Sequence, residues 1–215
     1  MIQRSIRGVI FDLDGTLADT FPVIVDAWNA GVAPIMGREY KPDEVISRFG
    51  EPEPIMIRNE VGDRWEEACE RYYAHYEKHH ASSVQPFEGI ETMLREVKRR
   101  GLAVGLVTGK SRRSADITLK DLGWSDLFAS VITGTDMKKQ KPEPDGLIDC
   151  AKAMGMNPAA CAMVGDSPAD IGAGKAAGMM TIVAAWHSVY LEKLKGMQPD
   201  AWAHTPADVV TLINK

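Results

Sequence analysis

Short apolar runs recur along the chain, and each of them is closed by a glycine or a polar residue. The runs are too short for helices, and several are rich in valine and isoleucine, as strands buried on both faces of a parallel sheet are. The pattern therefore predicts five strands, at Gly8–Leu13, Ala103–Val107, Ser130–Thr133, Ala160–Val164 and Thr181–Ala184.

Helical patterns fill the intervals between the later runs. In residues 90–100, apolar side chains recur on one helical face, and a glycine follows where a helix commonly ends. Residues 114–122 and 145–154 show the same arrangement, each again followed by a glycine. Strands that alternate with helices in this way predict an α/β fold whose parallel sheet is covered by helices on both faces.

Residues 19–86 break this alternation, because they contain no convincing buried strand. Their helical patterns, which are rich in aromatic residues, cover residues 23–33, 54–61 and 65–80. We therefore expect an inserted α-helical cap over the edge of the sheet, with residues 1–18 and 87–215 forming the core. Pro22 and Pro86 lie near the two ends of the insertion, where prolines can mark hinges.

The composition is that of an ordinary globular protein. Of the 215 residues, 45% are hydrophobic and 26% are charged, which suffices for one large domain or one domain with a small insertion. The formal net charge of -5 argues against a nucleic-acid surface, which usually needs a basic face. An anionic substrate would have to be bound by cations that the fold gathers locally.

The cysteines and the apolar runs bear on location. Cys69, Cys150 and Cys161 are far apart and form no Cys-x-x-Cys pair, which favours reduced, buried thiols over disulfides or a zinc site. The first residues do not resemble a signal peptide, and no apolar run is long enough to cross a membrane. We expect a cytoplasmic protein without membrane or nucleic-acid partners, present as a monomer or a weak dimer.

Two aspartates lie at the end of the first predicted strand. Asp12 and Asp14 are two residues apart, so strand geometry directs both carboxylates toward the same side. In an open parallel sheet, reacting groups belong in the crevice beyond the carboxyl ends of the strands. Carboxylates this close repel each other unless a cation lies between them or one is protonated. On its own, such a pair is still more often part of a turn.

The ends of three later strands carry complementary groups. Thr108 and Gly109 follow the second strand and offer a hydroxyl and a backbone N–H to a phosphate oxygen. Lys141 lies beyond the third strand, where two following prolines restrain the backbone and would aim its ammonium group. Asp166 ends the fourth strand and Asp170 follows one helical turn later, and oxygen ligands of this kind suit Mg²⁺.

These four segments, in this order, resemble the haloacid dehalogenase superfamily, specifically its phosphatase branch with a helical cap after the first motif. The run from Asp12 to Thr20, Asp-Leu-Asp-Gly-Thr-Leu-Ala-Asp-Thr, is the most specific part of a resemblance that covers nearly the whole chain. The position of the cap is similar to that in the phosphoglycolate phosphatase and β-phosphoglucomutase group. The resemblance implies a doubly wound sheet of five main parallel strands. It also implies a Mg²⁺-dependent phosphatase of a small phosphorylated metabolite, such as a phosphoglycolate-like phosphomonoester.

The resemblance further implies a role for each motif residue. Asp12 matches the nucleophile that forms an aspartyl-phosphate, and Asp14 matches the general acid that later activates water as a base. Thr108, Gly109 and Lys141 match the groups that bind and neutralise the phosphoryl oxygens. The implied metal-binding residues are Asp12, Asp14 through its backbone carbonyl, Asp166, and Asp170 either directly or from behind the other ligands.

The cap is expected to select the leaving group, because the other motifs recognise only phosphate. Arg48 lies in a segment that resembles a specificity loop, where it could hold a substrate carboxylate or a second phosphate, or simply lie on the surface. The three histidines within residues 75–80 are predicted to be surface groups, because no carboxylate or thiol partner is evident. Trp186 and His187, after the fifth strand, could reach the edge of the crevice.

Other functions fit parts of the pattern. An inorganic pyrophosphatase or a phosphomutase would use the same catalytic residues, and the sequence excludes neither. A non-catalytic regulatory module would be expected to lack one of four motif residues, Asp12, Asp14, Lys141 and Asp166, and all are present. A carbon–phosphorus hydrolase would need a cap lysine that forms a Schiff base, for which Lys41 is an unconvincing candidate. Dehalogenation is disfavoured, because dehalogenating relatives lack the acid at the position of Asp14.

Overall fold

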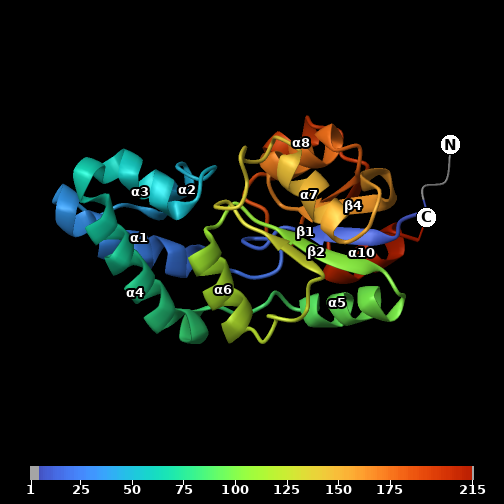
Figure 1. Ribbon diagram of the computed structural model, residues 1–215, viewed down its shortest axis with the longest axis horizontal. Coiled ribbons are helices and arrows are strands. Elements are labelled where there is room, and N and C mark those ends of the chain that lie inside the picture. Colours follow the sequence, from blue (N-terminus) through green and yellow to red (C-terminus); the bar gives the residue numbers. More distant parts are fainter. Residues whose placement is uncertain (1–4, 215) are drawn as a thin grey trace.

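Six parallel strands form one sheet in the computed structural model, which describes residues 5–214. Helices cover both faces of this sheet, and a further group of helices lies beside it (Figure 1). The strands are β1 (Gly8–Phe11), β2 (Ala103–Val107), β3 (Ser130–Ile132), β4 (Cys161–Gly165), β5 (Met180–Ala184) and β6 (Ala201–Ala203).

The strand order is β3-β2-β1-β4-β5-β6, so β1 lies inside the sheet. The chain runs from β1 toward one edge and then returns past it toward the other, which is the doubly wound arrangement. All five strands predicted from the apolar runs are present. The sequence pattern missed β6, because its three residues, Ala-Trp-Ala, form a run too short to be distinguished from a loop.

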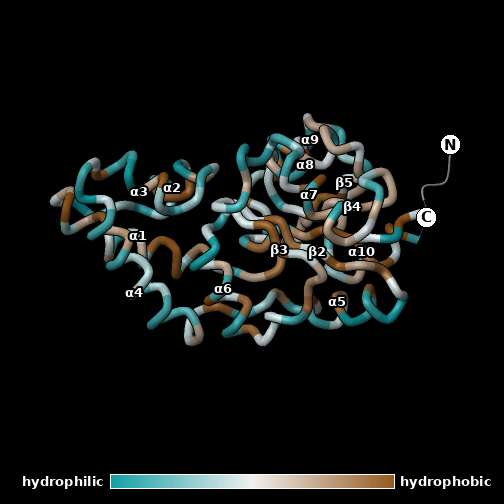
Figure 2. Tube along the Cα trace, viewed as in Figure 1, coloured by the Kyte–Doolittle hydropathy of each residue, from teal (hydrophilic) through white to brown (hydrophobic). Residues whose placement is uncertain are grey.

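The strands are apolar throughout because both faces of the sheet are buried. In β1, Val9 and Phe11 pack on one face and Ile10 packs on the other, as the alternation of side chains along a strand requires. In Figure 2, hydrophobic residues gather along the strands, whereas hydrophilic residues cover much of α5 (Ile90–Arg99). With α5, one face carries α6 (Arg112–Asp121) and α10 (Pro206–Leu212), and the other carries α7 (Asp145–Ala153), α8 (Pro168–Ala176) and α9 (Leu191–Lys195).

Four helices between β1 and β2 form a hydrophobic core of their own beside the sheet (Figure 1). These cap helices are α1 (Phe21–Met36), α2 (Pro42–Ile46), α3 (Glu53–Val61) and α4 (Trp65–Ser83). Trp28 of α1 and the aromatic rings of Tyr72 and Tyr76 in α4 are buried at its centre. The two helices approach closely at Gly31, where an added Cβ would lie 2.5 Å from the backbone oxygen of Ala68.

The cap helices join the core through two chain segments that lie side by side. Ala18, which leaves the core, and Pro86, which returns to it, form an isolated antiparallel bridge. A second contact runs between α4 and α6, where the Tyr76 and Thr118 hydroxyl oxygens lie 2.9 Å apart. The expected division of the chain at residues 19–86 falls at this bridge and stays a prediction.

The position of His80 corrects one expectation from the sequence. The local pattern predicts a surface group, but the His80 side chain is fully buried between α4 and α6. Its Nδ1 lies 2.9 Å from Oδ2 of Asp121, a carboxylate partner 41 residues away that no local pattern could reveal. Burial lowers the pKa of His80, although the hydrogen bond to Asp121 opposes this effect. His75 and His79 are partly exposed, with their rings in contact.

The three cysteines are buried and free, as expected. Cys69 lies in the core of the cap helices, and Cys150 and Cys161 lie beneath the sheet face that carries α7. Burial raises the pKa of the Cys69 thiol to about 12 and of the other two to about 11, which keeps all three protonated and unreactive. Within residues 5–214, no helix combines the length and the apolar character that crossing a membrane requires.

Candidate active site

A cavity lies at the carboxyl ends of the strands, with core residues on one side and residues of the cap segment on the other. Its volume is about 170 Å³, which is small beside the pockets of drug-sized ligands and suits a small metabolite. We call the core side the floor; loops that follow the strands supply it, as expected for an open parallel sheet. Six expected site residues line it: Asp12, Asp14, Thr108, Gly109, Lys141 and Asp166.

Asp12 directly follows β1, which places it on the floor of the cavity. Its backbone N–H donates to the carbonyl oxygen of Val164 in β4 at 3.0 Å, and the residue is almost completely buried. Burial raises the pKa of Asp12 to about 7, although the ammonium group of Lys141 opposes the rise. A carboxylate in such a place needs cations beside it to stay ionised at neutral pH.

Lys141 lies between two carboxylates of the floor. Its Nζ donates to Asp12 Oδ1 at 2.8 Å, to Asp170 Oδ1 at 2.6 Å and to the carbonyl oxygen of Val107 at 3.1 Å. Burial alone would lower the pKa of Lys141, but the two carboxylates raise it above its usual value. The ammonium group therefore stays charged, with all three of its donors directed by core residues. The peptide bond from Lys141 to Pro142 is cis.

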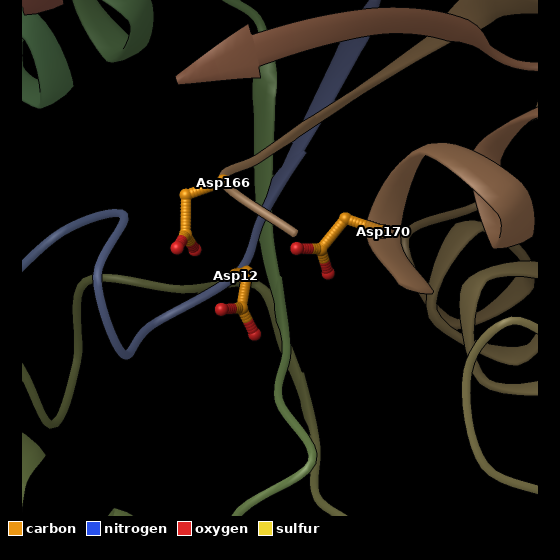
Figure 3. A group of neighbouring side chains, drawn as sticks. All are labelled: Asp12, Asp166 and Asp170. Carbon is orange, nitrogen blue, oxygen red and sulfur yellow. The ribbon is translucent and has the colours of Figure 1, made fainter. Parts of the chain in front are cut away.

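Asp12, Asp166 and Asp170 form a group of three buried carboxylates. One oxygen of each lies within 4.8 Å of the others, and Figure 3 shows the three side chains converging from two strand ends and the start of a helix. Burial raises the pKa of Asp166, and the neighbouring carboxylates add to the rise. Three carboxylates this close are unfavourable with only one lysine among them, so the donor set favours an added cation.

Neighbouring loops hold Asp166 and Asp170 in place. Thr16 Oγ1 donates to Asp166 Oδ1 at 2.9 Å. Gly15, at a φ of 79°, brings the same loop so close that an added Cβ would lie 2.6 Å from Asp166 Oδ2. Asp170 Oδ2 accepts from Ser167, from its N–H at 3.0 Å and its hydroxyl at 2.6 Å, while its Oδ1 accepts from the buried lysine. Both oxygens of Asp170 thus have partners, and its side chain lies behind the cavity wall.

Asp14 lies on the floor at the side of this carboxylate group. It accepts a hydrogen bond from the hydroxyl of Thr20, and its Oδ1 lies 3.2 Å from Lys110 Nζ. Thr108 is buried, and its Oγ1 accepts from the backbone N–H of Lys110 at 3.2 Å. Gly109 stands between these two residues at the cavity wall. The floor thus offers a partly exposed carboxylate, a hydroxyl and a glycine backbone to one small volume.

Sequence reasoning missed two charged residues of the cavity, Lys110 and Glu53. Lys110 is buried, with its Nζ 3.2 Å from Asp14 and 3.8 Å from Glu53. Burial alone would lower the pKa of Lys110, but Asp14 and its other neighbours raise it above the usual value. Glu53 begins α3 of the cap, yet its Oε2 accepts from the backbone N–H of Ser111 in the core at 2.6 Å. Lys110 could have been suspected from its place after Thr108; nothing local marks Glu53.

Arg48 is not among the described residues that line the cavity, and its expected role as a substrate contact stays a prediction. Its Nε lies 2.8 Å from Glu60 Oε2, and its guanidinium carbon lies 5.1 Å from the centre of the Tyr40 ring. These contacts direct the side chain into the cap itself. The following residues, 49–51, line the cavity instead.

Three other residues considered from the sequence lie outside the cavity lining. Trp186 Nε1 donates to the carbonyl oxygen of Thr16 at 3.0 Å, so it supports the loop after β1. His187 Nε2 lies 3.8 Å from Asp19 Oδ2, at the junction of core and cap segment. Lys41 is exposed at the start of α2. Among the described residues, none of these three contributes to the cavity wall.

The comparisons with known proteins agree with this fold. A family model described as haloacid dehalogenase-like hydrolase matches residues 9–184. A phosphoglycolate phosphatase from Xylella fastidiosa is 35% identical over 194 residues, which cover 84% of this chain and 80% of the relative. Pyrophosphatase PpaX from Bacillus velezensis is 29% identical over 210 residues, which cover 98% of this chain and 97% of the relative.

Solved structures show the same fold. A crystal structure described as that of a predicted phosphoglycolate phosphatase from Haemophilus somnus superimposes with a TM-score of 0.88, at 20% identity, over 97% of this chain and 98% of that one. The chain therefore belongs to the haloacid dehalogenase-like hydrolases, and it is an enzyme of their phosphatase branch with a helical cap after the first motif.

Proposed function

We propose that this protein is a Mg²⁺-dependent phosphatase that hydrolyses a small phosphomonoester through a covalent intermediate on Asp12. The observation that carries the proposal is the arrangement of Asp12, whose carboxylate accepts from Lys141 at 2.8 Å and belongs to a group of three carboxylates within 4.8 Å. Such a group serves phosphoryl transfer well, because that reaction depends on alignment and on neutralising the charge of the phosphoryl oxygens.

In the proposed first step, an Asp12 oxygen attacks phosphorus in line with the ester bond. The bond from phosphorus to the leaving oxygen breaks, and Asp14 donates a proton to the leaving alcohol. Lys141 offsets negative charge between the nucleophile and the phosphoryl group. Thr108 and the N–H of Gly109 bind phosphoryl oxygens, which fixes the angle of attack.

In the second step, Asp14 acts as a base because it has given up its proton. It takes a proton from a water molecule, whose oxygen attacks phosphorus and displaces the Asp12 carboxylate. The products are inorganic phosphate and the free enzyme. Asp14 keeps the proton that it took from water, so it can again act as an acid toward the next substrate. Asp14 therefore serves both steps, and its position beside Asp12 suits both roles.

The carboxylate group fits a resident Mg²⁺ ion, since Mg²⁺ prefers oxygen ligands and shares its coordination with phosphate. Asp12, Asp166 and the backbone carbonyl of Asp14 would hold this ion. Asp170 supports them, because both of its oxygens already have partners in Lys141 and Ser167. When bound, the ion would supply positive charge to the phosphoryl oxygens and relieve the repulsion among the carboxylates.

A phosphate-release assay tests this function. We expect turnover of a panel of phosphomonoesters with Mg²⁺, loss of turnover in excess EDTA, and a fall of at least about a thousandfold in Asp12→Asn, which lacks the nucleophile. Asp126→Asn makes the same change at an exposed position outside both the cap segment and the cavity lining, and it should keep the wild-type rate. Full activity of Asp12→Asn, or turnover that persists in EDTA, would overturn the proposal.

A further inference from the structure

The cap segment lines the cavity with apolar and acidic side chains; we call this side the roof. In the part of the chain that the structure describes, no lysine, arginine or histidine of the roof faces the cavity. Phe21 and Phe49 lie with their ring centres 5.8 Å apart. The other apolar side chains of the roof are those of Ile24 and Met56. The side chains of the roof are Phe21, Ile24, Phe49, Glu51, Glu53 and Met56.

The charges around the cavity are strongly negative. Its lining holds five carboxylates against two ammonium groups, those of Lys110 and Lys141. Both lysines already have carboxylate partners: Lys141 binds Asp12 and Asp170, and Lys110 lies beside Asp14 and Glu53. One divalent cation and the phosphoryl group of a substrate would offset each other. A second anionic group on the substrate would therefore meet repulsion with no free cation to receive it.

The two roof glutamates differ in their partners. Glu53 is buried, and its oxygens face the N–H of Ser111 and the ammonium group of Lys110. Glu51 is exposed and lines the cavity, and its carboxylate forms no hydrogen bond or ion pair among residues 5–214. It lies two residues after Phe49, at the point where the chain turns toward α3. Glu51 is therefore the roof carboxylate that remains available to a substrate.

We propose, on the basis of the phosphatase function above, that the substrate is an aminoalkyl phosphomonoester with no second anionic group. The short alkyl part of its leaving alcohol packs against Phe21, Phe49 and Met56, and its ammonium group pairs with Glu51. Phosphoglycolate carries a carboxylate and pyrophosphate carries a second phosphate, so both are poor matches to this roof. The cavity volume of about 170 Å³ suits an alcohol of a few carbon atoms.

A matched set of esters tests the proposal. 2-Aminoethyl phosphate, propyl phosphate and phosphoglycolate have leaving groups of similar size that end in a cation, a methyl group and an anion. We expect kcat/KM to fall in that order. The value for 2-aminoethyl phosphate should be at least about tenfold above those for phosphoglycolate and pyrophosphate, because the anionic groups of the latter two meet the Glu51 carboxylate and no free cation. A kcat/KM for phosphoglycolate or pyrophosphate above both other esters would overturn the proposal, as would propyl phosphate equal to the amine.

Charge reversal at the roof gives a second readout. Glu51→Lys should raise the ratio of kcat/KM for phosphoglycolate to that for 2-aminoethyl phosphate by about tenfold or more. Glu66→Lys makes the same charge change at an exposed position of α4 outside the cavity lining and should leave the ratio near that of wild type. Equal ratios in the two variants would overturn the role of Glu51.

The activated ester para-nitrophenyl phosphate separates the two proposals. Its turnover, abolished by Asp12→Asn, reports the phosphatase chemistry whatever the cap prefers. Turnover of this ester together with a preference for anionic leaving groups contradicts the aminoalkyl assignment alone. Absence of turnover with every ester, this one included, contradicts the phosphatase function and with it the assignment.

Discussion

The floor and the roof of the cavity are built from opposite kinds of side chain. On the floor, charged groups are held by one another: Lys141 binds Asp12 and Asp170, and Thr16 binds Asp166. On the roof, apolar side chains predominate, and the carboxylate of Glu51 has no hydrogen-bond or ion-pair partner among the described residues. The floor is therefore organised before a phosphate arrives. The roof side chains other than Glu53 can be exchanged without removing any of these contacts. This difference explains how one set of phosphate-binding groups can serve many leaving groups in a family.

Removing the lysine of the floor should have the largest effect. In Lys141→Met, Asp12 and Asp170 lose their shared cation, and the phosphoryl group loses a neutralising partner. We expect kcat/KM for para-nitrophenyl phosphate to fall by roughly a hundredfold to a thousandfold. Lys139→Met, at an exposed position of the same loop, is the control and should stay close to wild type. A fall of less than about tenfold in Lys141→Met would show that the floor does not depend on its internal ion pairs.

Adding Mg²⁺ should stabilise the floor. Because the ion relieves repulsion among three buried carboxylates, we expect saturating Mg²⁺ to raise the free energy of unfolding by about 3 kcal/mol, measured by denaturant titration with and without EDTA. Asp166→Asn should abolish most of this gain, while Asp126→Asn should keep it. An equal gain in Asp166→Asn and wild type would mean that the ion binds elsewhere.

Glu53 connects the roof to the floor, and its removal sharpens the comparison. Glu53→Ala leaves the buried N–H of Ser111 without its acceptor and removes a carboxylate from Lys110. We expect a loss of about 2 kcal/mol in the free energy of unfolding. Glu53→Gln, which keeps an acceptor for that N–H, should recover part of the loss. Wild-type stability in both variants would show that this contact does not hold the cap segment against the core.

Arg48 should give the smallest effect, because the structure places it away from the cavity. In Arg48→Ala, the loss of the partly exposed pair with Glu60 should cost less than about 1 kcal/mol. We expect kcat/KM to stay within about twofold of wild type for every ester. Glu60→Ala breaks the same pair and should match it. A selective rise of KM for anionic esters in Arg48→Ala would show that the roof does offer a cation, and the comparison would fail.

Most of the floor could be predicted from the sequence, because each group follows a strand directly. Asp12, Thr108 and Asp166 are placed by apolar runs of five or so residues, which indicate both the strand and its end. Parallel pairing then brings those ends together without any knowledge of side-chain contacts. The doubly wound sheet follows from the same pattern, apart from the short edge strand at residues 201–203.

The contacts of the cap segment could not be predicted in this way, because they join residues far apart in the chain. Glu53 meets Ser111 across 58 residues, and His80 meets Asp121 across 41. Helical periodicity states which face of a helix is apolar, but not which helix lies opposite. Arg48 shows the same limit, since it lies in the turn after α2 and its partner Glu60 lies in α3, which directs its side chain away from the cavity.

The most direct test of the proposed chemistry is detection of a phosphoryl group on Asp12. Asp14→Asn is the suitable variant, because para-nitrophenyl phosphate has a good leaving group that needs little protonation, whereas hydrolysis of the intermediate still needs a base. After acid quenching, mass spectrometry should find one phosphoryl group on the peptide that contains Asp12, and none in Asp12→Asn. Turnover of this ester by wild type, with no phosphoryl group on that peptide in the trapping variant, would contradict the account.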